Sequence, residues 1–141
     1  MKVSLKRIDK EFLFEVTNQN GHKILLDNKS KETGEAKGVS PMELLLMGIA
    51  GCSSIDVVAI LKKQKINPTL LKMKVEGFRH AEAVPSLFYQ IDLVIYLEGD
   101  FSAEKAKRAA KLSFEKYCSV SKTLEPTAQI NHRVIFNGEA I

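Results

Sequence analysis

The sequence predicts a single α+β domain spanning residues 1–141, and three features of the chain lead to this expectation. Several segments alternate apolar and polar residues, a pattern typical of strands with one buried face. The segment Met42–Leu61 is apolar or small on nearly every side, so it is expected to form a helix enclosed by other elements. The elements follow the order β-β-β-α-β-β-α-β without a repeat or a linker, and hairpins rather than parallel crossovers are expected.

Three strands are expected before the first helix, because each segment alternates in the strand pattern and turn residues separate them. The expected strands are Lys2–Ile8, Glu11–Val16 and His22–Leu26, with turns at Asp9-Lys10 and Asn20-Gly21. Asparagine followed by glycine supplies the positive φ angles that tight hairpins require. The polar segment Asp27–Gly38 is expected to be a loop that leads into the helix.

The first helix is expected to begin after Ser40 and to end near Lys65. Ser40 can cap the helix, Pro41 suits the first helical position, and Glu43 has the spacing of a capping box. Pro68 disfavours helical geometry at the residue before it and so terminates the helix. A subunit of 141 residues can hardly enclose so apolar a helix, so a dimer is expected.

The second half of the chain predicts two further strands, a second helix and a last strand. The expected elements are strands at Leu70–Arg79 and Leu87–Leu97, a helix at about Ala103–Tyr117, a short helical turn after Cys118 and a strand at Gln129–Phe136. Ser102 is expected to cap the second helix, and Pro126 to end the short turn.

Composition excludes several classes of protein. The long apolar segment contains Glu43, Ser53, Ser54 and Asp56, which favours a core helix over a membrane helix. The N-terminus alternates like a strand and has no signal-peptide pattern, so a cytoplasmic location is expected. The net charge is +4, but the lysines are spread along the chain and no aromatic RNA-binding motif accompanies them. Neither a nucleic-acid partner nor a membrane is expected.

The two cysteines, Cys52 and Cys118, are far apart in the sequence and belong to no CxxC motif. The three histidines, His22, His80 and His132, are scattered without ligand spacing. This pattern excludes a zinc ribbon and a thioredoxin motif, and no metal or cofactor is expected. On these facts alone, two inert core thiols are the simplest interpretation, since cysteine is among the most readily buried residues.

The local surroundings of the cysteines favour chemistry. Gly48 and Gly51 precede Cys52 in the helix, where glycine is unfavourable, so either helix packing or a functional site requires a close approach there. Asp56 follows Cys52 by four residues and shares its helical face, so it can hydrogen-bond within a site or line a polar pocket. Cys118 is expected at the start of a helical turn, which would make it the more acidic thiol.

Two motifs resemble the OsmC/Ohr-like family. Ser40–Cys52 resembles the family's central-helix signature, in which a Pro-x-Glu/Lys-Leu segment leads through small residues to a reactive cysteine. Cys118–Leu124 resembles the second motif, a cysteine followed by a Ser-Lys-rich turn. The resemblance covers nearly the whole chain and is strongest to the uncharacterised OsmC-like branch. It implies an OsmC-like fold, with antiparallel sheets wrapped around a long buried central helix in an intertwined homodimer.

The resemblance also implies an activity, the thiol-dependent reduction of a small hydroperoxide in oxidative-stress protection. Cys52 would be the peroxidatic residue and Cys118 the resolving one, and a dithiol reductant would reopen their disulfide. Peroxidase members pair an arginine with a glutamate ten residues before the reactive cysteine; here that position is Met42, and the acid is Glu43. A shift of one residue turns a helical side chain by about 100°. Arg7 is the guanidinium of the N-terminal region.

Two alternatives to an enzyme remain open. The chain can be a non-enzymatic OsmC-like dimer that binds a small hydrophobic or electrophilic ligand. The residues expected to line such a pocket are Met42, Leu45, Leu46 and Phe88. It can also be a dimer whose cysteines are purely structural, because fold alone does not fix function.

Overall fold

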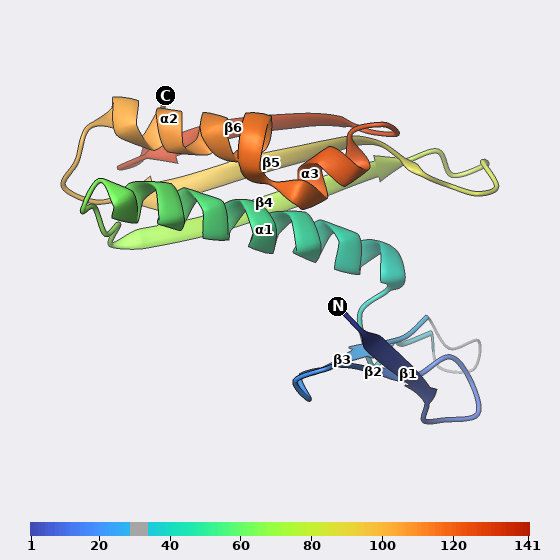
Figure 1. Cartoon of the computed structure of the whole chain (residues 1–141). Coiled ribbons are helices and arrows are strands. Elements are labelled where there is room, and N and C mark those ends of the chain that lie inside the picture. The colour runs from blue at the N-terminus through green and yellow to red at the C-terminus, as the bar shows by residue number, and fades with distance from the viewer. Residues whose placement is uncertain (29–33) are drawn as a thin grey trace. The chain divides into compact units, whose positions relative to one another are not determined.

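The computed structural model describes residues 1–28 and 34–141 and divides into two compact units, Met1–Leu45 and Leu46–Ile141 (Figure 1). Its elements are β1 (Val3–Arg7), β2 (Phe14–Asn18), β3 (Lys23–Leu26), α1 (Pro41–Lys63), β4 (Leu70–Arg79), β5 (Phe88–Glu98), α2 (Ala103–Leu112), η1 (Ser113–Tyr117), α3 (Ser119–Leu124), β6 (Gln129–Phe136) and β7 (Glu139–Ala140). The predicted α+β class is confirmed. Part of the loop expected over 27–38, residues 29–33, lies outside the described residues.

The first unit contains the antiparallel sheet β1-β2-β3. Strand β2 begins three residues later than the alternation predicts, because the side chain of Asp9 accepts hydrogen bonds from the backbone N–H groups of Glu11 and Leu13. These bonds hold the connection in a turn that would otherwise extend the strand. The next turn is the expected one, with Gly21 at a φ of +84°.

Helix α1 begins as predicted with a capping box. The N–H of Glu43 donates to the hydroxyl of Ser40 at 3.2 Å, and the N–H of Ser40 donates to the Glu43 carboxylate at 2.7 Å. Each bond satisfies a backbone donor that the helix leaves free at its N-terminus. At the other end, Lys65 adopts a φ of +60° and ends the helical path close to the predicted residue.

The second unit contains the sheet β4-β5-β6-β7, and one expectation about it is wrong. Strands β4 and β5 form the predicted antiparallel hairpin, but β5 and β6 are parallel. The helices between β5 and β6 return the chain to the start of the sheet, so β6 runs in the direction of β5. The two-residue strand β7 was not predicted; it follows a tight turn in which Asn137 and Gly138 have positive φ.

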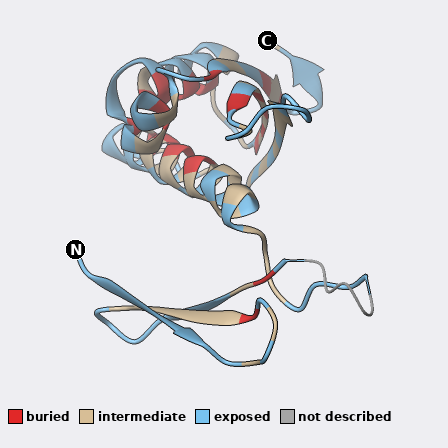
Figure 2. Cartoon of the chain, turned by 90° about the vertical axis from the view of Figure 1, so that its right-hand side faces the viewer, coloured by how far each residue is buried: buried red, intermediate tan, exposed pale blue. Residues whose placement is uncertain are grey.

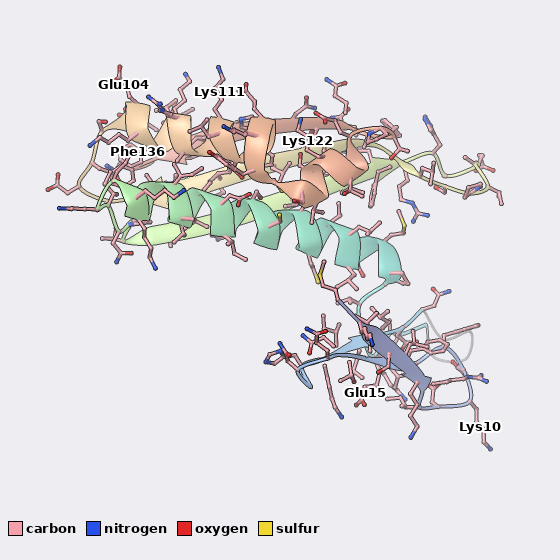
Figure 3. All side chains as sticks on the ribbon, viewed as in Figure 1. Lys10, Glu15, Glu104, Lys111, Lys122 and Phe136 are labelled. Carbon is pink, nitrogen blue, oxygen red and sulfur yellow. The ribbon has the colours of Figure 1, made fainter. Side chains whose placement is uncertain are left out.

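The helices of the second unit lie on one side of its sheet, and the buried residues lie between the two layers (Figure 2). The sheet contributes alternate residues of β5, which are at most 1% exposed: Ile91, Leu93, Ile95 and Leu97. Helix α1 contributes residues spaced four apart along one of its faces, all 0% exposed: Ile49, Ser53, Val57 and Leu61. Helix α2 contributes three alanines and directs charged residues such as Glu104 and Lys111 away from the core (Figure 3).

The opposite row of α1 is exposed although it is equally apolar. It consists of Met47, Gly51, Ile55 and Ala59, and Ile55 is 70% exposed. By length and composition alone, α1 is the one helix in the described part of the chain that can cross a membrane, with a mean hydropathy of 2.2 and 22% of that stretch buried. The enclosure predicted for this helix is therefore incomplete in one copy of the chain.

Gly77 of β4 allows α1 and β5 to approach the strand closely. A Cβ atom at this position would lie 2.5 Å from a ring carbon of Phe88 and 2.9 Å from Cδ2 of Leu46. Both distances are shorter than packed carbon atoms tolerate, so any side chain must displace one of its neighbours. Glycine here is a packing requirement of the second unit.

Replacing Gly77 by alanine is expected to reduce the free energy of unfolding by about 1–3 kcal/mol, the usual cost of overpacking a core. Urea denaturation at a fixed protein concentration measures this change. The cost should be smaller in a Phe88→Leu background, because the clashing ring is then absent. An unchanged or increased stability of Gly77→Ala would show that the contact does not constrain the fold.

Candidate functional site

The structure brings Cys52 and Cys118 together from segments far apart in the sequence. Cys52 is on α1, and Cys118 stands between η1 and α3. Their sulfur atoms and a carboxylate oxygen of Asp56 all lie within 4.8 Å of one another. The helical spacing of Cys52 and Asp56 predicted a shared face, and both residues contribute to this cluster.

A π-helical turn determines where Cys118 lies. The sequence predicts a regular helix to Tyr117, but the last five residues form η1, closed by a 2.7 Å hydrogen bond from the N–H of Cys118 to the carbonyl of Ser113. The hydroxyl of Ser113, which is fully buried, donates to the carbonyl of Ser53 on α1 at 3.3 Å and lies 3.4 Å from a carboxylate oxygen of Asp56. The wider turn is thus attached to the helix that carries Cys52.

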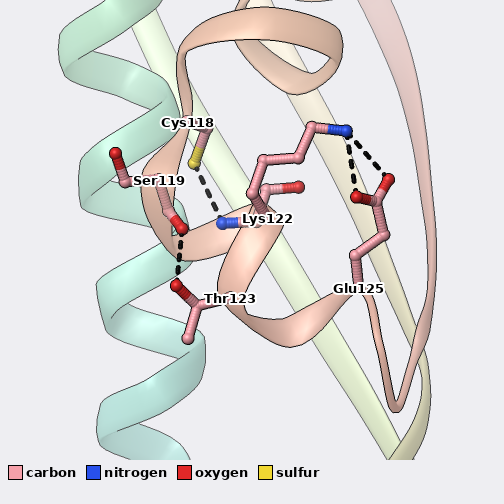
Figure 4. Close-up of polar contacts among 6 residues, drawn as sticks. Cys118, Ser119, Lys122, Thr123 and Glu125 are labelled. Atoms are coloured by element: carbon pink, nitrogen blue, oxygen red, sulfur yellow. Dashed lines mark hydrogen bonds and ion pairs between the residues drawn. The ribbon is translucent and has the colours of Figure 1, made fainter.

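Cys118 is the N-cap of α3, and its sulfur accepts the N–H of Ser121 at 3.4 Å (Figure 4). This bond favours the thiolate, as the sequence predicted. However, Cys118 is 0% exposed, and burial raises its pKa to about 11 in spite of the Ser121 bond, with further increases from neighbouring Cys52 and Asp56. Cys118 is therefore a protonated thiol at neutral pH, and the expectation of an acidic Cys118 is wrong because burial outweighs the helix terminus.

Cys52 is half-buried, and the two glycines before it are not explained by contacts among the described residues. A Cβ atom at Gly51 would meet no atom of the described residues within 4 Å, and one at Gly48 would meet only Val120 at an ordinary 3.8 Å. Both explanations for these glycines, helix packing and a close-fitting functional site, therefore stay predictions.

The charged residues considered from the sequence have partners of their own. The capping box accounts for Glu43, whose pKa is lowered by the backbone and side-chain hydrogen bonds of Ser40. By the helical repeat, nine residues place Glu43 about half a turn away from the direction of Cys52. The guanidinium of Arg7 donates to the carbonyls of Lys10 and Glu11 in its own turn. Lys122, four residues after Cys118, forms an ion pair with Glu125 at 2.9 Å (Figure 4).

Each histidine has a neighbour within its own unit. His22 contacts the side chain of Asn18, His80 stacks on Tyr89, and His132 stacks on Phe114. Within residues 1–28 and 34–141, the one group of three side chains placed to share a metal ion is Cys52, Asp56 and Cys118. The sequence motifs for metal binding require closely spaced cysteines or histidines, so they did not indicate this group.

The residues proposed for a hydrophobic ligand pocket are partly used in packing. Leu46 and Phe88 meet over Gly77, and Phe88 is 5% exposed. Two hollows on the second unit lie elsewhere. One, of about 900 Å³, is lined by residues of β4, β5 and β6 that include Lys74 and Tyr96, and the other, of about 500 Å³, lies beside the end of α1 and the start of α2. Neither hollow contains a cysteine.

Comparisons with known proteins find one family model, curated relatives and solved structures of the same fold. A family model described as OsmC-like protein matches residues 34–133. The protein YhfA of Escherichia coli K12 is 42% identical over 114 residues, which cover 80% of this chain and 81% of YhfA. The crystal structure of a hypothetical protein from Aquifex aeolicus is 30% identical, with a TM-score of 0.79 and 96% of each chain covered. The organic hydroperoxide resistance protein OhrB of Bacillus subtilis shares the fold at 18% identity, with a TM-score of 0.67 and coverages of 94% and 96%.

The raised pKa of Cys118 predicts how fast this thiol reacts. In a Cys52→Ser variant, alkylation of Cys118 should be slow at pH 7.5. Its rate should continue to rise with pH well beyond the ordinary thiol pKa of 9.0, because burial, the largest cause of the raised pKa of Cys118, remains in this variant. Intact-mass measurement of iodoacetamide labelling from pH 7 to 11 follows the rate. Urea-unfolded protein is the control and should titrate near 9.0. A folded-state midpoint below 9 would contradict the burial argument.

Proposed function

The chain belongs to the OsmC-like protein family, and from this premise we propose that it reduces hydroperoxides with Cys52 and Cys118 acting as one redox pair. The observation that supports the proposal most is the proximity of the two sulfur atoms, which lie within 4.8 Å of each other although they come from distant segments. Two cysteines that only fill space in a core do not have to lie this close together. A disulfide requires the sulfurs to approach to about 2.05 Å.

The first step would take place at Cys52, because it is the partly exposed cysteine. Its thiolate attacks the outer oxygen of the hydroperoxide, and the O–O bond breaks. The remainder of the substrate takes up a proton and leaves as an alcohol, or as water when the substrate is hydrogen peroxide. Cys52 is thereby oxidised by two electrons to a sulfenic acid.

The second step would join the cysteines. The sulfur of Cys118 attacks the sulfur of the sulfenic acid, and the thiol proton of Cys118 and the hydroxyl group of the sulfenic acid leave as water. The buried, protonated state of Cys118 suits this role, because a neutral thiol in the core is protected from direct oxidation. A dithiol reductant then opens the disulfide by thiol exchange. We place this chemistry in the cytoplasm, where such reductants are maintained.

The peroxide substrate is inferred by analogy. The name of OhrB of Bacillus subtilis describes organic hydroperoxide resistance, but at 18% identity that likeness establishes only the fold. The residues considered for an arginine–glutamate pair are engaged elsewhere: Arg7 donates to carbonyls of its own turn, and Glu43 bonds to Ser40 in the capping box. We therefore propose a slower peroxidase than one in which an arginine supports the reactive sulfur.

We also propose a homodimer, because the exposed row of α1 requires a cover. Met47, Gly51, Ile55 and Ala59 form a continuous apolar surface on the helix that carries Cys52. Small residues at two of these positions let another helix approach closely, which explains why Gly51 has open space beside it. A second copy offers the same row, so a two-fold axis along this surface covers both helices at once.

The peroxidase proposal is tested by steady-state consumption of cumene hydroperoxide and hydrogen peroxide with a dithiol. Turnover should vanish in Cys52→Ser, whereas Cys118→Ser should turn over only transiently and accumulate sulfinic acid, detected by intact mass. Ser119→Ala, at an exposed position beside Cys118, is the matched control and should retain wild-type turnover. Wild-type consumption no faster than that of the free dithiol would rule out the enzyme in this form.

The dimer is tested by substituting Gly51 with leucine. The bulky side chain has room in one chain but not beneath a second helix, so the dimer should dissociate at least about tenfold more readily, a change of ~1.4 kcal/mol. Sedimentation equilibrium reports the mass, which is 15.7 kDa for one chain. Lys111→Leu, an exposed change on α2, should leave the dimer intact. A wild-type protein that sediments as one chain at micromolar concentration would contradict the proposal.

A further inference from the structure

The cluster of Cys52, Asp56 and Cys118 contains one side chain that the redox proposal does not use, the carboxylate of Asp56. Two thiols are sufficient for a peroxidase cycle, yet a carboxylate oxygen lies within 4.8 Å of both sulfurs. The arrangement thus brings three side chains that can ligate a metal ion close together.

We propose that the reduced protein binds one Zn²⁺ ion per chain through the sulfurs of Cys52 and Cys118 and a carboxylate oxygen of Asp56. Thiolate and carboxylate are both established ligands of zinc, a cation of intermediate softness. Three protein ligands leave the fourth tetrahedral position to water. The sequence analysis expected no metal; the proximity of the three side chains in the structure is what leads to this proposal.

The dimensions of the cluster fit a tetrahedral zinc ion after a small contraction. With Zn–S bonds of about 2.3 Å and a Zn–O bond of about 2.0 Å, tetrahedral angles separate the two sulfurs by about 3.8 Å and each sulfur from the oxygen by about 3.5 Å. The ligand atoms here already lie within 4.8 Å of one another, so the two sulfurs need to close by at most about 1.0 Å and each sulfur and the oxygen by at most about 1.3 Å. Cys52 and Asp56 are on one rigid helix at a spacing of four residues, which fixes two of the three ligands.

Residues that hydrogen-bond to the ligand side chains orient them without contacting the ion. The buried hydroxyl of Ser113 lies 3.4 Å from a carboxylate oxygen of Asp56, and the N–H of Ser121 donates to the sulfur of Cys118. Hydrogen bonds of this kind hold metal ligands in position and account for a substantial part of affinity. Cys52 and Asp56 are only half-buried, which leaves an entry path for the ion.

Charge explains why a divalent cation is the expected occupant. Binding requires both thiols to lose their protons, and the ion's two positive charges then compensate the two thiolates, while Asp56 supplies a third anionic ligand. Zinc affinity should therefore fall as the pH is lowered, with protons released on binding.

The inference does not rest on the proposed peroxidase function, because it requires only that the thiols be reduced. Both proposals use Cys52 and Cys118, however, so one chain cannot hold the ion and carry out the peroxidase reaction at the same moment. A disulfide between these residues removes both thiolate ligands, so the oxidised protein cannot hold the ion. Bound zinc in turn occupies the sulfur that would attack a peroxide.

The test uses untagged, reduced, chelator-treated protein under anaerobic conditions, with Co²⁺ as the spectroscopic probe and Zn²⁺ as the competitor. One equivalent of Co²⁺ per chain should produce thiolate-to-cobalt charge transfer in the near ultraviolet and tetrahedral d–d bands in the visible. Zn²⁺ should abolish both. Cys52→Ser and Cys118→Ser should each lose most of the charge-transfer absorption.

Asp56→Asn should weaken zinc binding by at least about tenfold. Losing a residue that only hydrogen-bonds to a metal ligand can already cost that much, and Asp56 is proposed as a ligand itself. Glu115→Gln, which removes an exposed carboxylate from the neighbouring π-helical turn, is the matched control and should bind as the wild type does. Circular dichroism of every variant checks that it is folded. No thiolate–cobalt band in the folded wild type, or equal affinity in Asp56→Asn and wild type, would overturn the proposal.

Peroxide turnover in the same chelator-treated protein separates the two proposals. Metal binding without turnover leaves the zinc site standing and rejects the peroxidase. Turnover without a thiolate–cobalt band rejects the zinc site and leaves the peroxidase.

Discussion

The site depends on one buried polar contact between two helices. The hydroxyl of Ser113 donates to the backbone carbonyl of Ser53, and this bond attaches the π-helical turn η1 to α1. Both serines are 0% exposed, so neither can exchange this partner for water without opening the core. Because Cys118 follows directly after η1 and Cys52 directly precedes Ser53, the same contact fixes the cysteines relative to each other. The proximity of two thiols that are distant in the sequence is a consequence of how η1 packs on α1.

Burial then differentiates the two cysteines. Cys118 has the helix-terminal position that usually favours a thiolate, but its complete burial raises its pKa to about 11 and keeps it protonated. Cys52 is the cysteine that outside molecules can reach, and it lies beside the exposed apolar row of α1. The division of roles that the family resemblance implies, with Cys52 attacking and Cys118 resolving, is thus the one that burial also favours. The helix terminus predicted an acidic Cys118, but burial has the larger effect on its pKa.

The features that could be predicted from sequence are those determined by near neighbours along the chain. The capping box of Ser40 and Glu43 and the strand alternation of β4 and β5 follow from local rules, and the structure has both as expected. The parallel pairing of β5 with β6 and the π-helical turn depend on how distant segments pack, and no local pattern signals them. The shared face of Cys52 and Asp56 was predictable from helical spacing, but the arrival of Cys118 on that face was not. Hence local patterns indicated each cysteine separately and the family resemblance implied that they act as a pair, whereas the grouping of both sulfurs with the Asp56 carboxylate emerges only in three dimensions.

The most direct test of the account is to titrate reduced, metal-free protein with one equivalent of cumene hydroperoxide and to map the disulfides without reduction. The account predicts that both thiols are lost together, and that the peptides carrying Cys52 and Cys118 become linked within a single chain. Thiols that remain unchanged, or a linkage only between chains, would contradict the claim that Cys52 and Cys118 form one redox pair.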